Sequence, residues 1–256
     1  MLTYSGSTAG PAGAVLLLHA FPVSGAMWEP QVTALEEAGF SVVAPDVYGF
    51  DGSPARIDWD MEDYCHALTR LLDSLGIDKV SIVGLSMGGY QAFAFYRLYP
   101  ERTRSIVLCD TRANADTPEA YAQRMVFCRA VEANGPMEAA GRMVPNFFAA
   151  GTYESNPELV RKTREMIIRQ PALAISDAMK AIAGRADATW LLPEIKCPVL
   201  IMNGIEDRVT TPETAASMHA LIPGSRLEIL PDAGHLSNLE QPELFNRLLL
   251  EHLKSL

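Results

Sequence analysis

The sequence has no Cys-x-x-Cys pair and no apolar run long enough to cross a membrane. Its four cysteines, spread irregularly over 256 residues, are Cys65, Cys109, Cys128 and Cys197. This spacing argues against a disulfide framework or a cysteine metal site, so we expect buried free thiols. Near the N-terminus no basic segment precedes an apolar stretch, as it would in a signal peptide, and we therefore expect a cytoplasmic protein.

Basic residues are also scarce, with 21 Lys and Arg against 31 Asp and Glu and a formal net charge of −10. A surface of this sign repels nucleic-acid phosphates and anionic membranes, so we expect neither as a partner. No Gly-Lys-Ser/Thr phosphate loop and no His/Cys cluster occurs, so we expect no cofactor and no metal. Apolar residues make up 48% of the chain, which is enough for a sizeable core.

Apolar runs that suggest buried strands recur along the chain. They lie at Ala14–Leu18, Ser41–Ala44, Val80–Val83, Ser105–Cys109, Pro198–Met202 and Arg226–Leu230. Most are apolar at every position, which is typical of parallel strands buried on both faces. Helical patterns lie between them, at residues 27–38, 64–75 and 242–253. The alternation predicts an α/β fold with a doubly wound, mostly parallel sheet and a site beyond the carboxyl ends of its strands.

The stretch from residue 111 to residue 190 breaks this alternation. It holds helix-like segments at residues 118–133, 136–144, 157–169 and 172–183, and no convincing strand. We therefore expect a core of residues 1–110 and 191–256, with residues 111–190 inserted as a helical cap over the site. Its large apolar residues, Trp190 among them, are expected mostly to pack on the core. Most of its arginines are expected at the surface, but one of Arg112, Arg124, Arg129 and Arg142 could hold a substrate carboxylate.

The most informative motif is Gly84-Leu85-Ser86-Met87-Gly88, which follows an apolar strand and precedes a helix-like run. In this context Gly-x-Ser-x-Gly forms a sharp bend that exposes the serine hydroxyl. Glycines flank the serine because larger side chains would collide with neighbouring elements. We therefore expect Ser86 to be a nucleophile at the carboxyl edge of the sheet.

A serine nucleophile needs a base within hydrogen-bond reach, and the base needs an orienting acid. We expect His235 as the base, because it follows the last strand in a loop, whereas His66, His219 and His252 fall in helical patterns. The acid should lie between serine and histidine, after a strand. Asp207 is favoured because its loop precedes the histidine-bearing strand, with Asp110 as the alternative and Glu206 as a weaker third candidate.

Ester chemistry also needs N–H donors for the developing oxyanion. One is expected from Met87, directly after the nucleophile. The second should come from the loop after an early strand, and we assign it to Phe21, because the next residue, Pro22, has no N–H. His19 in the same loop is expected to have a structural role, tying the loop down through hydrogen bonds.

These motifs together resemble the α/β-hydrolase family over nearly the whole chain. The resemblance is closest to small carboxylesterases and to the 3-oxoadipate enol-lactonase-like branch, whose lid entrance is similar to residues 110–120. It implies an α/β-hydrolase fold, a Ser86–His235–Asp207 triad and a helical cap. The chain departs from the usual pattern where the family commonly has His-Gly and Arg-Gly, since it carries His19-Ala20 and Tyr48-Gly49.

We expect a serine hydrolase that cleaves carboxylic esters, with a small-molecule ester or lactone as substrate. Alternatives are a lactonase for enol-lactones or acyl-homoserine lactones, a carbon–carbon bond hydrolase, a perhydrolase, and a non-catalytic ligand receptor. Ser86 argues against haloalkane dehalogenases and epoxide hydrolases, which form an ester on an aspartate. The sequence does not indicate an oligomeric state.

Overall fold

Seven strands form one sheet, in the order β1-β3-β2-β4-β5-β6-β7. The computed structural model describes residues 1–256. The strands are β1 (Tyr4–Ser5), β2 (Ala14–Leu18), β3 (Ser41–Pro45), β4 (Val80–Leu85), β5 (Thr103–Cys109), β6 (Val199–Gly204) and β7 (Arg226–Leu230). All neighbours pair in parallel except β1, which runs antiparallel to β3. The predicted α/β class and mostly parallel sheet are confirmed, and the two-residue β1 is an addition.

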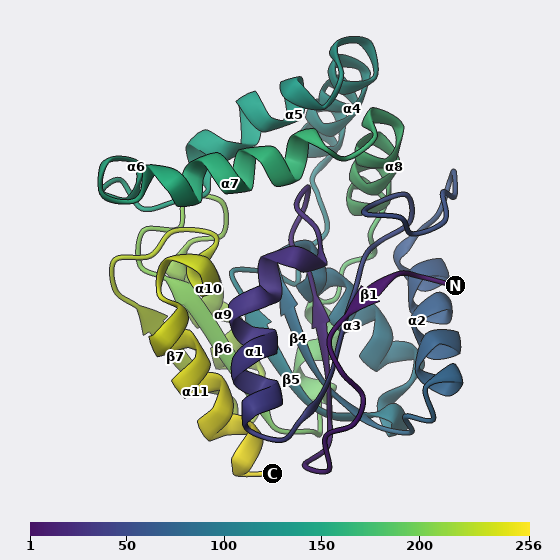
Figure 1. The fold of residues 1–256 in the computed structure, drawn as a ribbon, viewed down its shortest axis with the longest axis vertical. Helices are drawn as coiled ribbons and strands as arrows, with labels where there is room; N and C mark the ends of the chain where they lie inside the picture. Colours follow the sequence, from purple (N-terminus) through teal and green to yellow (C-terminus); the bar gives the residue numbers. More distant parts are fainter.

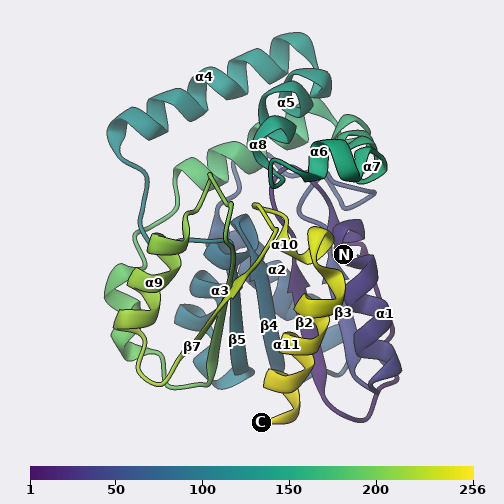
Figure 2. The same ribbon diagram turned by 90° about the vertical axis from the view of Figure 1, so that its left-hand side faces the viewer.

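Helices cover both faces of this sheet. In Figures 1 and 2, α1 (Glu29–Glu37) and α11 (Pro242–Lys254) lie on one face, and α2 (Met61–Ser74), α3 (Met87–Leu98) and α9 (Pro212–Leu221) lie on the other. The remaining short elements are the helix α10 (Ser237–Glu240) and the 3₁₀ turns η1 (Gly25–Trp28), η2 (Pro100–Arg102) and η4 (Thr189–Glu194). No helix of the chain combines the length and apolar character needed to span a membrane.

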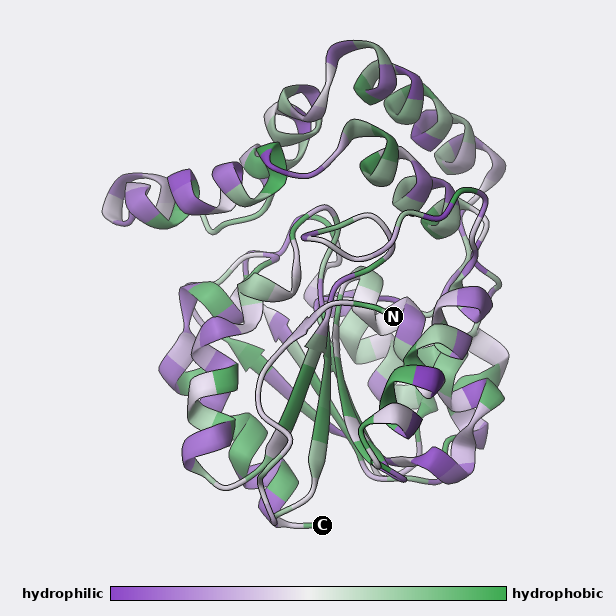
Figure 3. Ribbon diagram, turned by 45° about the vertical axis from the view of Figure 1, so that its right-hand side comes forward, coloured by the Kyte–Doolittle hydropathy of each residue, from purple (hydrophilic) through white to green (hydrophobic).

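The core lies between the sheet and its two helical layers. Every residue of β3, β4 and β6 is buried, which explains why these strands are apolar at nearly every position. Figure 3 shows the hydrophobic strands in the middle of the molecule, with the helices turning their hydrophilic sides outward. All four cysteines are free thiols, and only Cys197 is partly exposed.

The segment from residue 111 to residue 190, which we call the helical insertion, joins β5 to β6. It contains α4 (Pro118–Asn134), α5 (Pro136–Met143), the 3₁₀ turn η3 (Val144–Asn146), α6 (Thr152–Ser155), α7 (Pro157–Ile168) and α8 (Ala172–Ala183), and no strand. These helices lie above the carboxyl ends of the strands (Figures 1 and 2). Trp190 does not pack as expected, because it is 59% exposed. The division into two domains stays a prediction.

Candidate active site

Ser86 forms the bend between β4 and α3, with φ 54° and ψ −109°. A positive φ is strained for a residue with a side chain and costs on the order of 1–3 kcal/mol. The flanking glycines make the bend sterically possible. A Cβ on Gly84 would lie 2.3 Å from the carbonyl oxygen of Gly88, and one on Gly88 would lie 2.0 Å from that of Leu18.

Neighbouring backbone and side-chain groups hold the strained bend in place. The Ser86 N–H donates to the carbonyl of Cys109 at the end of β5 (2.9 Å). The hydroxyl of Thr111 donates to the Ser86 carbonyl (2.8 Å). Gly89 gives Thr111 its space, since a Cβ there would lie 2.3 Å from Thr111 Oγ1. The start of the helical insertion therefore supports the bend that carries Ser86.

His235 and Asp207 meet at the same edge of the sheet. Nδ1 of His235 lies 2.9 Å from Oδ2 of Asp207, and both side chains are almost fully buried. His235 follows β7, Asp207 follows β6 and Ser86 follows β4, so all three lie beyond the carboxyl ends of parallel strands. Because Asp207 occupies Nδ1, a neutral His235 keeps Nε2 free to accept a proton.

The Asp207 carboxylate accepts hydrogen bonds from its own loop as well. Oδ1 accepts from the N–H groups of Val209 (2.7 Å) and Thr210 (3.0 Å), and Oδ2 accepts from the Thr210 hydroxyl (2.6 Å). Burial alone would raise the pKa of Asp207, but His235 and Thr210 outweigh it and hold that pKa below its usual value. Sequence reasoning missed Thr210. The available signal was the Asp-x-x-Thr spacing, which is typical of an Asx-type turn.

The two alternative acids bond elsewhere. Asp110 accepts from the Gly204 N–H (2.8 Å) and from the Ser237 hydroxyl (2.5 Å). Burial and the neighbouring Asp207 raise the pKa of Asp110 well above its usual value. Glu206 accepts from the Ala150 N–H (3.0 Å). The structure thus joins His235 to Asp207 and to neither alternative, and no group of three or more His, Cys, Asp or Glu side chains could hold a metal ion.

The loop after β2 is held by His19. Nδ1 of this buried ring lies 2.9 Å from the Ala20 carbonyl, and Nε2 accepts from the Val47 N–H (3.1 Å). Burial lowers the pKa of His19 to about 4, so the ring is neutral at pH 7 and Nδ1 is the donor. In a trans peptide the carbonyl and the next N–H point in opposite directions. By fixing the Ala20 carbonyl, His19 therefore orients the N–H of Phe21.

Two N–H groups, those of Phe21 and Met87, have no acceptor in the protein. The N–H of Phe21 donates to no group of the protein. Met87 is the first residue of α3, and the first four N–H groups of a helix have no partner inside the helix. These are the two residues that the sequence predicts for oxyanion binding.

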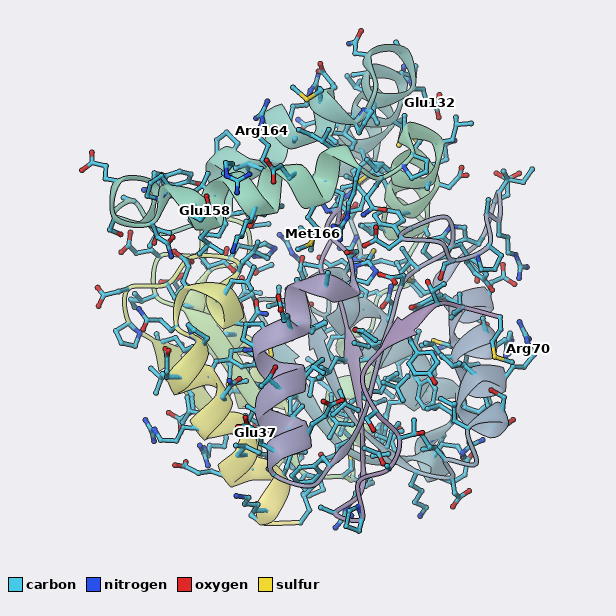
Figure 4. All side chains as sticks on the ribbon, in the orientation of Figure 1. Glu37, Arg70, Glu132, Glu158, Arg164 and Met166 are labelled. Carbon is cyan, nitrogen blue, oxygen red and sulfur yellow. The ribbon has the colours of Figure 1, made fainter.

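Residues of the helical insertion close over the site. Ser86 is only 8% exposed and His235 only 2%. The ring of Phe147 stacks on His235 with centroids 5.9 Å apart, and the ring of Phe127 meets that of Phe21 edge-on at 5.9 Å. Met166 points from α7 toward the core (Figure 4), where its sulfur accepts from the Ser24 N–H (3.4 Å). Apolar side chains therefore pack over the loops that carry Ser86 and His235.

The arginines of the insertion differ in how their charge is neutralised. Arg124 pairs with Asp116, Arg142 pairs with Glu138, and Arg129 is exposed. Arg112 has no carboxylate within ion-pair distance. Its Nη2 donates to the carbonyl of Val209 (2.5 Å), and its Nε is buried without a partner. Among the four, Arg112 alone combines partial burial with an unpaired charge.

A profile of the α/β hydrolase fold family matches residues 13–242. The chain belongs to this family. It is 31% identical over 245 residues to 3-oxoadipate enol-lactonase 1 of Acinetobacter baylyi, an alignment that covers 96% of this chain and 90% of the relative. The predicted resemblance to this family and to its enol-lactonases is confirmed.

Solved structures of this α/β-hydrolase family give the same result. A thermophilic esterase from Thermogutta terrifontis, with malate bound, matches with a TM-score of 0.94 and 38% identity, over 99% of this chain and 93% of the other. An enol-lactonase from Burkholderia xenovorans matches with a TM-score of 0.89 and 27% identity, over 99% and 96%. These relatives support a carboxylic ester hydrolase, as the sequence predicts.

Proposed function

We propose that this hydrolase is a serine carboxylesterase with Ser86 as nucleophile, His235 as base and Asp207 as orienting acid. The observation that carries the proposal is the bond between His235 Nδ1 and Asp207 Oδ2 (2.9 Å). It fixes the tautomer that leaves Nε2 free, at the same sheet edge as the strained Ser86 bend. This is the division of roles that a serine triad requires.

In the first half of the proposed reaction, Ser86 Oγ attacks the ester carbonyl while His235 Nε2 takes the hydroxyl proton. The carbonyl oxygen becomes an oxyanion, which accepts hydrogen bonds from the N–H groups of Phe21 and Met87. One such donor is worth on the order of 3 kcal/mol in barrier height. The tetrahedral intermediate then expels the alcohol, which receives the proton from His235, and an acyl-enzyme remains on Ser86.

In the second half, a water molecule attacks the acyl carbonyl and His235 takes its proton. The same two N–H groups bind the second oxyanion. When this intermediate collapses, Ser86 Oγ leaves and recovers the proton from His235, and the carboxylic acid is released. Asp207 stays ionised throughout and stabilises the imidazolium each time it forms, consistent with the low pKa of its carboxyl.

Covalent labelling with a fluorophosphonate tests this proposal directly. The wild-type protein should take up one label, on Ser86, and hydrolyse p-nitrophenyl acetate. Ser86→Ala should lose the label and at least about three orders of magnitude in kcat, with unchanged thermal unfolding. Full ester hydrolysis by Ser86→Ala would refute the proposed nucleophile. Tight binding of small molecules without labelling would indicate a receptor.

A second candidate function is hydrolysis of a lactone that carries a carboxylate. Arg112 favours it, because its cation has no carboxylate partner in the protein and it lies two residues from Asp110, beside the Asp207 loop. The enol-lactonase relatives and the malate bound to the thermophilic esterase point to the same chemistry. A panel of p-nitrophenyl esters, an enol-lactone and an acyl-homoserine lactone separates the two functions. Much faster turnover of the open-chain esters would exclude the lactonase.

A further inference from the structure

Glu240, the last residue of α10, connects the histidine loop to the helical insertion. Its Oε2 accepts from the N–H of Gly234, the residue before His235 (2.6 Å). Its Oε1 accepts from the N–H of Ala149 (2.8 Å) and from the hydroxyl of Thr152 (2.6 Å), both in the insertion. In Figures 1 and 2, α10 accordingly lies just below α6. One carboxylate thus bridges two segments that are far apart in the sequence.

The other side of His235 is tied to the same part of the insertion. The N–H of Leu236 donates to the carbonyl of Phe147 (3.1 Å). The ring of Phe147 also stacks on the His235 ring, with an interplanar angle of 27°. The backbone on both sides of His235 is therefore bonded to residues 147–152, at Leu236 directly and at Gly234 through Glu240.

The loop that carries Gly234 packs tightly against the backbone of residues 148–149 in the insertion. A Cβ on Gly234 would lie 2.6 Å from the carbonyl carbon of Phe148 and 2.7 Å from the nitrogen of Ala149. Glycine at this position allows the histidine loop and the insertion backbone to touch. A shift of the insertion would consequently displace Gly234, and with it the imidazole of His235.

We propose that Glu240 is a positioning residue. It links the position of the helical insertion on the core to the position of the His235 imidazole. The chemistry of the bridge requires a carboxylate, because the donors on both sides are N–H or O–H groups and both oxygens must accept. The inference rests on the proposed role of His235 as base.

Glu240→Gln tests the coupling, because glutamine has the same shape but only one acceptor oxygen. Either Gly234 or Ala149 then faces an NH₂ group. We expect kcat for p-nitrophenyl acetate to fall about tenfold or more with KM within about twofold, since small misplacements of a catalytic group are costly. To correct for inactive protein, kcat of each variant is calculated per molecule that a fluorophosphonate labels. The low-field NMR signal of the His235 Nδ1 proton should broaden or shift.

Glu206→Gln is the matched control. Glu206 also ties the insertion to the core, through the Ala150 N–H, but its side chain makes no bond to the histidine loop. This variant should retain kcat within about twofold. If Glu240→Gln does not fold, Thr152→Val decides the question, because it removes one donor to Glu240 and should lower kcat about threefold.

The inference is overturned if Glu240→Gln keeps wild-type kcat and the wild-type NMR signal, or if Glu206→Gln loses as much kcat. It is also overturned if Glu240→Gln only lowers the melting temperature while each labelled molecule works at the wild-type rate. Failure of the proposed function itself would look different, because the wild-type protein would then take up no fluorophosphonate.

Discussion

The hydroxyl of Thr210 donates a 2.6 Å hydrogen bond to Oδ2 of Asp207, the same oxygen that lies 2.9 Å from Nδ1 of His235. Thr210 Oγ1 is also 3.4 Å from that nitrogen. One carboxylate oxygen therefore has two partners, and Thr210 limits how far the carboxylate can rotate away from the imidazole.

Thr210→Val should weaken the proposed triad without changing the volume of the side chain. A hydrogen bond to a charged group is worth about 1.5 kcal/mol or more, so we expect kcat to fall about tenfold. Thr210→Ser keeps the hydroxyl and should remain within about threefold of wild type. Steady-state kinetics on p-nitrophenyl acetate measures both. Equal activity in Thr210→Val and wild type would remove Thr210 from the site.

Asp207→Asn and Asp110→Asn should differ sharply, although both aspartates follow strands. Asparagine at 207 carries no charge to stabilise the His235 imidazolium, and its NH₂ group can donate to Nδ1 and select the wrong tautomer, so kcat should fall by roughly four orders of magnitude. Asparagine at 110 resembles the protonated acid that burial favours there, so activity should change less than about tenfold. Kinetic assays of both variants at pH 8 are the measurement. The reverse order of effects would make Asp110 the acid.

Two buried histidines predict how stability depends on pH. Burial lowers the pKa of both His19 and His252 to about 4. As the pH falls from about 6.5 to about 4, the unfolded chain binds a proton at each and the folded chain does not. The free energy of unfolding should therefore fall, by up to about 1.4 kcal/mol per pH unit for each histidine.

His252→Asn isolates one of these contributions, because His252 lies in α11, away from the loop after β2 that His19 holds. Urea denaturation at several pH values in this window should give a shallower slope than wild type, whatever the overall change in stability. An unchanged slope would show that His252 is not kept neutral by the fold.

Arg112→Gln tests carboxylate recognition. If Arg112 binds a substrate carboxylate, the variant should raise KM for an anionic lactone about tenfold or more and leave KM for p-nitrophenyl acetate within about twofold. Arg129→Gln, at an exposed position of the same insertion, is the control and should affect neither substrate. Equal changes for charged and neutral substrates would assign Arg112 to holding the Asp207 loop through Val209.

Gly88→Ala should disrupt the serine bend. The new methyl group would lie 2.0 Å from the backbone oxygen of Leu18, so β2 and α3 must separate. We expect a loss of about 3 kcal/mol in the free energy of unfolding and little fluorophosphonate labelling. Gly141→Ala, in α5 with no atom near its Cβ, should instead be neutral or stabilising by up to about 1 kcal/mol.

The sequence predicted six strands and the residues at their carboxyl ends because buried parallel strands leave a continuous apolar signal. It could not reveal β1 or α10, because elements of two and four residues are too short to show a period. The choice between Asp207 and Asp110 stayed open, since both follow a strand and only the positions of neighbouring loops separate them. The sequence did not indicate a role for Glu240. Most of its partners are backbone N–H groups, and such contacts leave no pattern in the sequence.

The sheet pairs Cys109 of β5 with Met202 of β6, and the helical insertion leaves after the first strand and returns before the second. Because β5 and β6 are parallel, the chain leaves at the carboxyl end of one strand and enters the amino end of the other. The two ends of the insertion meet where the N–H of Ala188 donates to the carbonyl of Ala113 (2.9 Å). A change in the length or sequence of this excursion need not alter any strand pairing. Evolution, or a designer, can therefore exchange parts of the insertion other than Thr111 and residues 147–152 while the sheet and the loops that carry Ser86, Asp207 and His235 keep their geometry.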